Sequence, residues 1–170
     1  MHRETLGIYL NDHLAGATLG VGLARRVARR YRRSGRSADL EQIAEEIAQD
    51  RQALLSIMDD LGVTASRYKM CAGWAAERVR RLKPNAVLHR KSGLDTVMEL
   101  ETLRLGVEGK SLLWLMLLPL APGRPDLDES QLKDLLDRAH RQIRALEELR
   151  RTAAAAVFSL QDARTTPAEQ

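Results

Sequence analysis

The chain has few aromatic side chains, a single cysteine and no long uninterrupted apolar run. Aromatic residues make up 4% of its 170 residues, whereas helix-forming alanine, leucine, arginine and glutamate dominate, which favours helices over sheets. Cys71 has no second cysteine to pair with, which excludes an intramolecular disulfide and favours a reducing cytoplasm. The most apolar run, residues 112–121, contains Pro119 and is shorter than the roughly 20 residues that span a bilayer. We therefore expect a cytoplasmic protein with no membrane span.

Apolar residues recur at helical spacing through most of the chain. This pattern predicts an all-α protein with four long helices, at about 4–33, 37–61, 93–118 and 128–160. A shorter helix is expected at about 66–82, within the long crossover that joins the second long helix to the third. The predicted architecture is one four-helix bundle over residues 1–160, followed by a disordered tail at 161–170.

Acidic residues fall on the predicted apolar faces of two helices. Glu101 and Glu108 lie seven residues apart and share a face with apolar residues of the third long helix. That face is made of Leu94, Val97, Met98, Leu105, Leu112, Leu115 and Met116. Asp50 lies within the apolar stripe of the second helix. Since a carboxylate is rarely buried unless it is paired, protonated or bound to metal, these acids are the candidate site.

Two stretches carry a resemblance to a known family. Residues 44–62, AEEIAQDRQALLSIMDDLG, and residues 100–116, LETLRLGVEGKSLLWLM, resemble the second and third bundle helices of ferritin-like proteins. The nearest are rubrerythrin-related and YciF-type stress-response families of bacterial style. In the second stretch Glu101 is followed five residues later by Gly106, as in the family. The resemblance implies a ferritin-like bundle, and in working members a di-iron centre held by inward Glu residues and two Glu-x-x-His motifs.

This chain departs from that pattern, because it contains no Glu-x-x-His motif. We therefore expect no ferroxidase or peroxidase activity. The favoured hypothesis is a non-catalytic, stress-associated or scaffold protein that has no cofactor and whose ancestral metal centre has eroded. The alternative is an atypical Fe, Mn or Zn site with weak oxidase activity. Its candidate ligands are Asp50, Glu101, Glu108 and His140, with Glu46 and His13 nearby.

The positive charge is clustered, within a net charge of +4 and a pI near 9.6. A third hypothesis is that two basic blocks make salt-sensitive contacts with nucleic acid or another polyanion. The candidate contact residues are Arg25, Arg26, Arg29, Arg30, Arg32, Arg33, Arg78, Arg80, Arg81 and Lys83. The alternative explanation is a solvated helix end that is favoured by the helix dipole.

Two further features bear on helix packing and assembly. From Leu112 to Leu118 the third long helix is apolar on every side, so either the predicted helix at 66–82 or a second subunit covers its outer face. A homodimer through this region is the partner that we expect. In the first helix, Gly16, Gly20 and Gly22 predict a close approach of a neighbouring helix.

Overall fold

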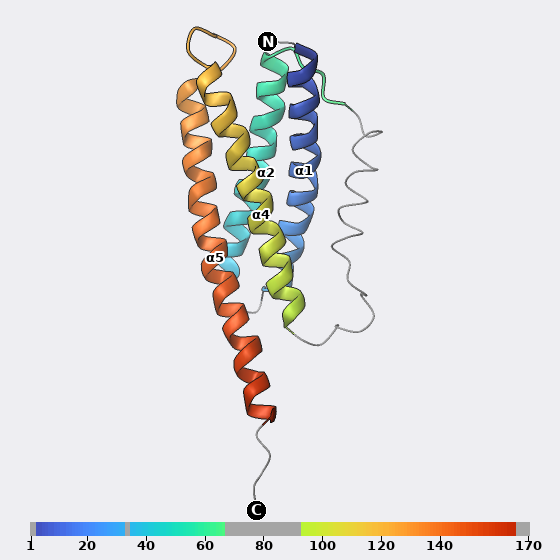
Figure 1. Ribbon diagram of the computed structural model, residues 1–170, viewed down its shortest axis with the longest axis vertical. Coiled ribbons are helices and arrows are strands. Elements are labelled where there is room, and N and C mark those ends of the chain that lie inside the picture. Colours follow the sequence, from blue (N-terminus) through green and yellow to red (C-terminus); the bar gives the residue numbers. More distant parts are fainter. Residues whose placement is uncertain (1–2, 33–34, 67–92, 166–170) are drawn as a thin grey trace, which may run out of the picture.

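The described part of the chain is an all-α bundle of four long helices (Figure 1). The computed structural model describes residues 3–32, 35–66 and 93–165, without the side chains of Arg3 and of residues 160–165. The helices are α1 (Arg3–Arg30), α2 (Ser37–Asp60), α4 (Leu94–Leu117) and α5 (Glu129–Thr165), and a short 3-10 helix, η1 (Leu118–Leu120), follows α4. The bundle and its four long helices were predicted correctly, whereas the helix expected at 66–82 falls almost wholly outside the described residues.

The helices pack as two antiparallel pairs. α1 packs against α2, α4 packs most extensively against α5, and α1 also contacts α4. Figure 1 shows that α1 and α5 run in one direction along the bundle, whereas α2 and α4 run in the other. α2 therefore ends at one end of the bundle and α4 begins at the other, in agreement with the long connection that the sequence predicted between the two pairs.

The inner face of α2 matches the sequence pattern. All seven apolar residues that were predicted to face inward are buried, namely Leu40, Ile43, Ile47, Leu54, Ile57, Met58 and Leu61. Polar residues occupy most of the opposite side, so the pattern identifies a single apolar stripe. Each of these large side chains contributes a few kcal/mol, since truncating a buried leucine or isoleucine to alanine costs about 2–5 kcal/mol.

Hydrogen bonds cap the C-terminus of α2 and the N-terminus of α5. Gly62 follows α2 with φ +62°, and the N–H groups of Gly62 and Val63 donate to the carbonyls of Asp59 and Met58, both at 2.8 Å. This is a Schellman arrangement, in which glycine accepts the left-handed conformation and the last carbonyls gain partners. At the start of α5, Asp128 Oδ1 accepts hydrogen bonds from the N–H groups of Ser130 (2.8 Å) and Gln131 (3.1 Å). Both ends agree with the predicted boundaries.

The face of α4 that was predicted to point inward is wrong for four of its seven residues, whereas Val97 is buried and Leu94 and Met116 are partly buried. Leu105, Leu112 and Leu115 are 65%, 55% and 53% exposed, and Met98 is also exposed. The residues that do face the core are Val97, Leu100, Leu103, Val107, Ser111, Leu113, Trp114 and Leu117. Because α4 carries apolar residues on nearly every side, its hydrophobic pattern contains two stripes. Packing against α1 and α5 buries the stripe that periodicity alone did not single out.

Three glycines of α1 were predicted to lie close to a neighbouring helix. Among the described residues, a Cβ atom added to Gly16, Gly20 or Gly22 would meet no neighbouring atom within 4 Å, so the predicted close approach is not found in this part of the chain. A neighbour does come near Gly7, where an added Cβ would lie 3.6 Å from Cγ1 of Val63.

α5 is longer than its partners and continues beyond the other three helices (Figure 1). It ends at Thr165, so the helix includes the first residues of the segment predicted as a tail. Near its far end the side chain of Phe158 is 55% exposed.

Candidate functional site

The most deeply buried ionisable group that the structure describes is Asp50, near the middle of α2. Its side chain is 0% exposed, and it lies between Ile47 and Leu54 on the inner stripe of the helix. The prediction that Asp50 is buried is therefore confirmed. Ser111 and Gln142 are the other polar side chains found buried in the described part of the chain.

Two cationic side chains from the other helical pair hold the Asp50 carboxylate. Lys110 Nζ, on α4, donates a short hydrogen bond to Asp50 Oδ2. Arg138 Nη2, on α5, lies 2.7 Å from Asp50 Oδ1 in an ion pair that lacks the alignment of a hydrogen bond. The Lys110 and Arg138 side chains are 12% and 24% exposed, so the carboxylate is shielded from water while the cations reach towards the edge of the bundle.

Gln142, on α5, connects these charges to a second carboxylate. Its carbonyl oxygen accepts a hydrogen bond from Lys110 Nζ (2.6 Å), and its amide nitrogen lies 2.9 Å from Glu46 Oε2 and 3.4 Å from Asp50 Oδ2. Both ends of the amide therefore have partners. We call Glu46, Asp50, Lys110, Arg138 and Gln142 the central polar cluster. Two acids face two cations in it, so its formal charges balance.

Burial and charge shift two pKa values in the central polar cluster. Burial lowers the pKa of Lys110, and the attraction of Asp50 offsets only part of this effect. At Glu46, burial alone would raise the carboxyl pKa. Hydrogen bonds from Gln142 and Gln42, with the charges of Arg138 and Arg141, outweigh burial and lower the pKa of Glu46 overall. A lowered pKa keeps the Glu46 carboxylate ionised opposite its cationic neighbours.

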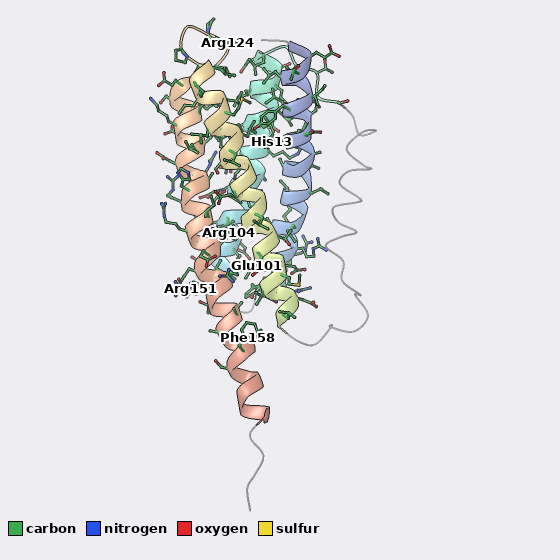
Figure 2. The ribbon with its side chains drawn as sticks, in the orientation of Figure 1. His13, Glu101, Arg104, Arg124, Arg151 and Phe158 are labelled. Carbon is green, nitrogen blue, oxygen red and sulfur yellow. The ribbon has the colours of Figure 1, made fainter. Side chains whose placement is uncertain are left out.

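Two of the predicted metal ligands lie on the protein surface. Glu101, which was expected to be buried, is exposed on α4 (Figure 2). Its Oε1 lies 3.3 Å from Nη1 of Arg150. The prediction of a buried Glu101 is wrong because it relied on the inverted face of α4. His140 is exposed on α5. Glu108 is half-buried, on the same helical face as the exposed Leu105 and Leu112.

Glu101 belongs to a surface network of charges between α4 and α5. Arg150 bridges Glu101 and Glu147, and Arg104 Nε lies 3.3 Å from Glu147 Oε2. With Leu105 these four side chains line a shallow, open depression. Each acid already has an arginine partner, so the network is best described as a set of surface ion pairs.

His13, on α1, packs against an aromatic ring. The ring centroids of Tyr9 and His13 are 4.5 Å apart at an interplanar angle of 61°, an edge-to-face arrangement. Partial burial lowers the pKa of His13, and the nearby charge of Asp12 opposes this shift. The neutral imidazole is therefore favoured at this position.

The predicted ligands do not gather into a metal site. Among the described residues, no three His, Cys, Asp or Glu side chains form a group that could hold a metal ion. Glu46 and Asp50 do belong to one cluster, but its remaining members are cations and an amide. The donor set around Asp50 therefore does not fit a metal ion.

The two basic blocks can be described only in part. Most arginines of the first block, at the end of α1, are exposed. Arg33 and the whole second block lie outside the described residues, and the second block comprises Arg78, Arg80, Arg81 and Lys83.

Comparison of the chain with protein-family models, with curated proteins and with solved structures gave no match. Among the described helices, none is long and apolar enough to cross a membrane.

The sequence interpretation missed Lys110, Arg138 and Gln142. Two of them follow the inner stripes of their helices. Lys110 continues the spacing of Leu103, Val107 and Trp114, and Gln142 lies between the buried Ala139 and Leu146. A cation and an amide on inward positions, opposite an inward acid, are the signal that could have found the central polar cluster.

Proposed function

We propose that this protein is a non-catalytic, ferritin-like helical bundle with a scaffold or stress-associated role, acting by binding other macromolecules. The observation that carries the proposal is the contact of both Asp50 oxygens with cations of the same chain, Lys110 and Arg138. In working di-iron bundles, inward carboxylates bind the metal ions. Here internal side chains supply the positive charge that a metal would otherwise bring.

The chemistry of the neighbouring groups supports this proposal. A metal ion bound to Asp50 would lie next to the ammonium of Lys110 and the guanidinium of Arg138, and both charges would repel it. The Gln142 carbonyl, a second oxygen ligand, already accepts a hydrogen bond from Lys110. Metal binding would therefore require two salt bridges to break and two charged side chains to move.

Elemental analysis tests the proposal directly. We expect protein purified without added metal to contain less than about 0.1 equivalent of Fe, Mn or Zn. Adding these ions should leave its melting temperature unchanged, because a ligand that binds only the folded state raises the melting temperature. The Asp50→Asn variant is the matched control. If Asp50 were a metal ligand, the wild-type chain and this variant would differ in bound metal and in the change of melting temperature on adding metal. One equivalent of metal that is lost in Asp50→Asn would contradict the proposal and favour the metal-binding alternative.

Self-association is a second candidate, and the exposed face of α4 favours it. Met98, Leu105, Leu112 and Leu115 are exposed on this helix, on a face that also carries Glu101 and Glu108. Exposed apolar side chains on one face of a helix, rimmed by polar residues, often mark a protein interface. We propose a homodimer in which the outer face of α4 packs against a second copy.

Sedimentation equilibrium tests the homodimer. We expect a concentration-dependent dimer that Leu112→Glu dissociates, because a charge would be buried at the interface. Ala145→Glu introduces the same charge at an exposed position of α5 and should leave the dimer intact. A monomer at every concentration would contradict self-association without bearing on the metal-free reading of the cluster.

A further inference from the structure

Exposed arginines gather where α1 ends and the turn to α2 begins. Each of the six described arginines in this region is exposed, and together we call them the α1 arginine surface. They are Arg25, Arg26, Arg29, Arg30, Arg32 and Arg36. In Figure 1 this end of α1 lies at the end of the bundle where α4 starts.

Within the described part of the chain, four of these six arginines have no acidic partner. Arg30 Nη1 lies 3.0 Å from Glu99 Oε2, across the contact between α1 and α4. For Arg25, Arg26, Arg29 and Arg32, the structure of the described residues shows no carboxylate within ion-pair distance. Besides Arg30, acidic partners are found in the described residues for basic side chains on α4, on α5 and in the connection between them. Those residues are Arg104, Lys110, Arg124, Lys133, Arg138 and Arg150.

The helix dipole accounts for only part of the α1 arginine surface. Arg29 and Arg30 lie in the last turn of α1, where a positive charge stabilises the carbonyl end of the helix. Arg25 and Arg26 precede that turn, and the dipole effect falls off within one turn. Placing these additional cations side by side costs free energy through repulsion, so a role outside helix stability is indicated.

The composition of the surface favours phosphate as its ligand. All the basic residues are arginines, whose planar fork of donors matches the oxygens of a phosphate group. Arg25 and Arg29, and likewise Arg26 and Arg30, are four residues apart, so they form two rows in which neighbouring side chains leave the helix about 6 Å apart along its axis.

The apolar residues of this region discriminate between phosphate-bearing partners. In the described stretch from residue 24 to residue 32, Ala24, Val27 and Ala28 are buried and Tyr31 packs against the core, so this stretch offers no exposed apolar side chain for insertion into a lipid bilayer; the exposed Leu19 lies earlier on α1. For the same reason it offers no exposed ring for stacking on the bases of a single strand. The backbone of a duplex requires neither feature, because its contacts are made to phosphates alone.

We propose that the α1 arginine surface binds the phosphate backbone of double-stranded nucleic acid without reading its sequence. The inference rests on the proposed function, since it names one class of macromolecule that the bundle binds. Arg25, Arg26, Arg29 and Arg32 supply the free charges, while Arg30 is held by Glu99.

The test is the salt dependence of binding of the full chain to a fluorescent duplex of random sequence, measured by anisotropy. Four phosphate contacts predict that the logarithm of the binding constant falls against the logarithm of salt concentration with a slope of about −3.6 or steeper. Arg25→Gln with Arg29→Gln should make this slope shallower by about 2, because each phosphate contact contributes about 1. A second duplex of different sequence should bind equally well.

Arg141→Gln with Arg144→Gln is the matched control. It removes the same charge from exposed positions of α5, which Figure 1 shows on the opposite side of the bundle from α1, and should leave the slope unchanged. Circular dichroism of both double variants checks that each is folded.

Three results would overturn the inference. They are no duplex binding at low salt, a slope that changes in the α5 control but not in the α1 variant, and equal or tighter binding to vesicles that contain anionic phospholipid. None of these results concerns the metal content of the central polar cluster, which tests the proposed function. This inference and the proposed function are therefore contradicted by different observations.

Discussion

Removing the charge of Asp50 while keeping its shape is the sharpest test of the central polar cluster. Asp50→Asn leaves Lys110 and Arg138 facing each other without their shared anion. Breaking a buried ion pair by removing one partner typically costs 3–5 kcal/mol, and since Arg138 is 24% exposed and can turn towards water, we expect about 3 kcal/mol. In a domain of this size that corresponds to a fall of roughly 6–12 °C in the melting temperature.

Urea unfolding followed by circular dichroism provides the assay. In a double-mutant cycle, Asp50→Asn and Lys110→Met together should cost less than the sum of the two single changes, with a coupling energy of about 1–3 kcal/mol. Glu45→Gln, at an exposed position of the same helix, should change the unfolding free energy by less than about 0.5 kcal/mol. A loss below about 1 kcal/mol for Asp50→Asn, or additive single changes, would refute the description of the cluster as a buried, coupled ion pair.

Three further outcomes are expected. Because the pKa of His13 is lowered in the folded protein, the unfolded chain takes up a proton first as pH falls through the ordinary value of 6.5. The unfolding free energy should therefore decrease below that pH, and the decrease should be smaller in His13→Gln. Urea unfolding midpoints of both proteins at about pH 7.5 and 5.5 test this. Gly16→Ala should raise stability by about 0.5–1 kcal/mol, because its site is open and helical, whereas Gly62→Ala should lower it by about 1–2 kcal/mol through its positive φ; thermal melts that rank the two variants in the opposite order would contradict this account. Glu101→Gln removes an exposed ion pair and should cost less than about 1 kcal/mol in urea unfolding, with or without a metal chelator.

The contrast between α2 and α4 shows how far the sequence alone could go. In α2, polar residues alternate clearly with an apolar stripe, so both the helix and the burial of Asp50 could be predicted. In α4, apolar residues surround the helix, and a wheel of side chains cannot say which stripe meets a neighbour. The error on Glu101 follows directly from that ambiguity, since Glu101 shares the face of Leu105 and Leu112.

The partners of Asp50 were missed for a different reason. Lys110 and Arg138 come from two other helices, at sequence separations of 60 and 88 residues, and a single sequence does not state which helices are adjacent. Each is a long cationic side chain of a type that usually keeps its charge in water, so residue type alone assigns it to the surface, although here it is largely covered and its charge reaches an acid. The bundle could be predicted from periodicity, but the chemistry at its centre depends on distances between helices.

The salt bridge of Lys110 also restricts the orientations that α4 can take. A helix with apolar residues on nearly every side could rotate about its own axis and still pack leucine against its neighbours. Apolar packing alone therefore allows several rotations of similar free energy. A half-turn would carry the Lys110 ammonium out to solvent and leave the buried Asp50 carboxylate with Arg138 as its remaining cationic partner, at a cost of several kcal/mol. The Lys110 ammonium thereby determines which leucines of α4 are exposed to solvent. It also determines which surface of α4 is available to a binding partner.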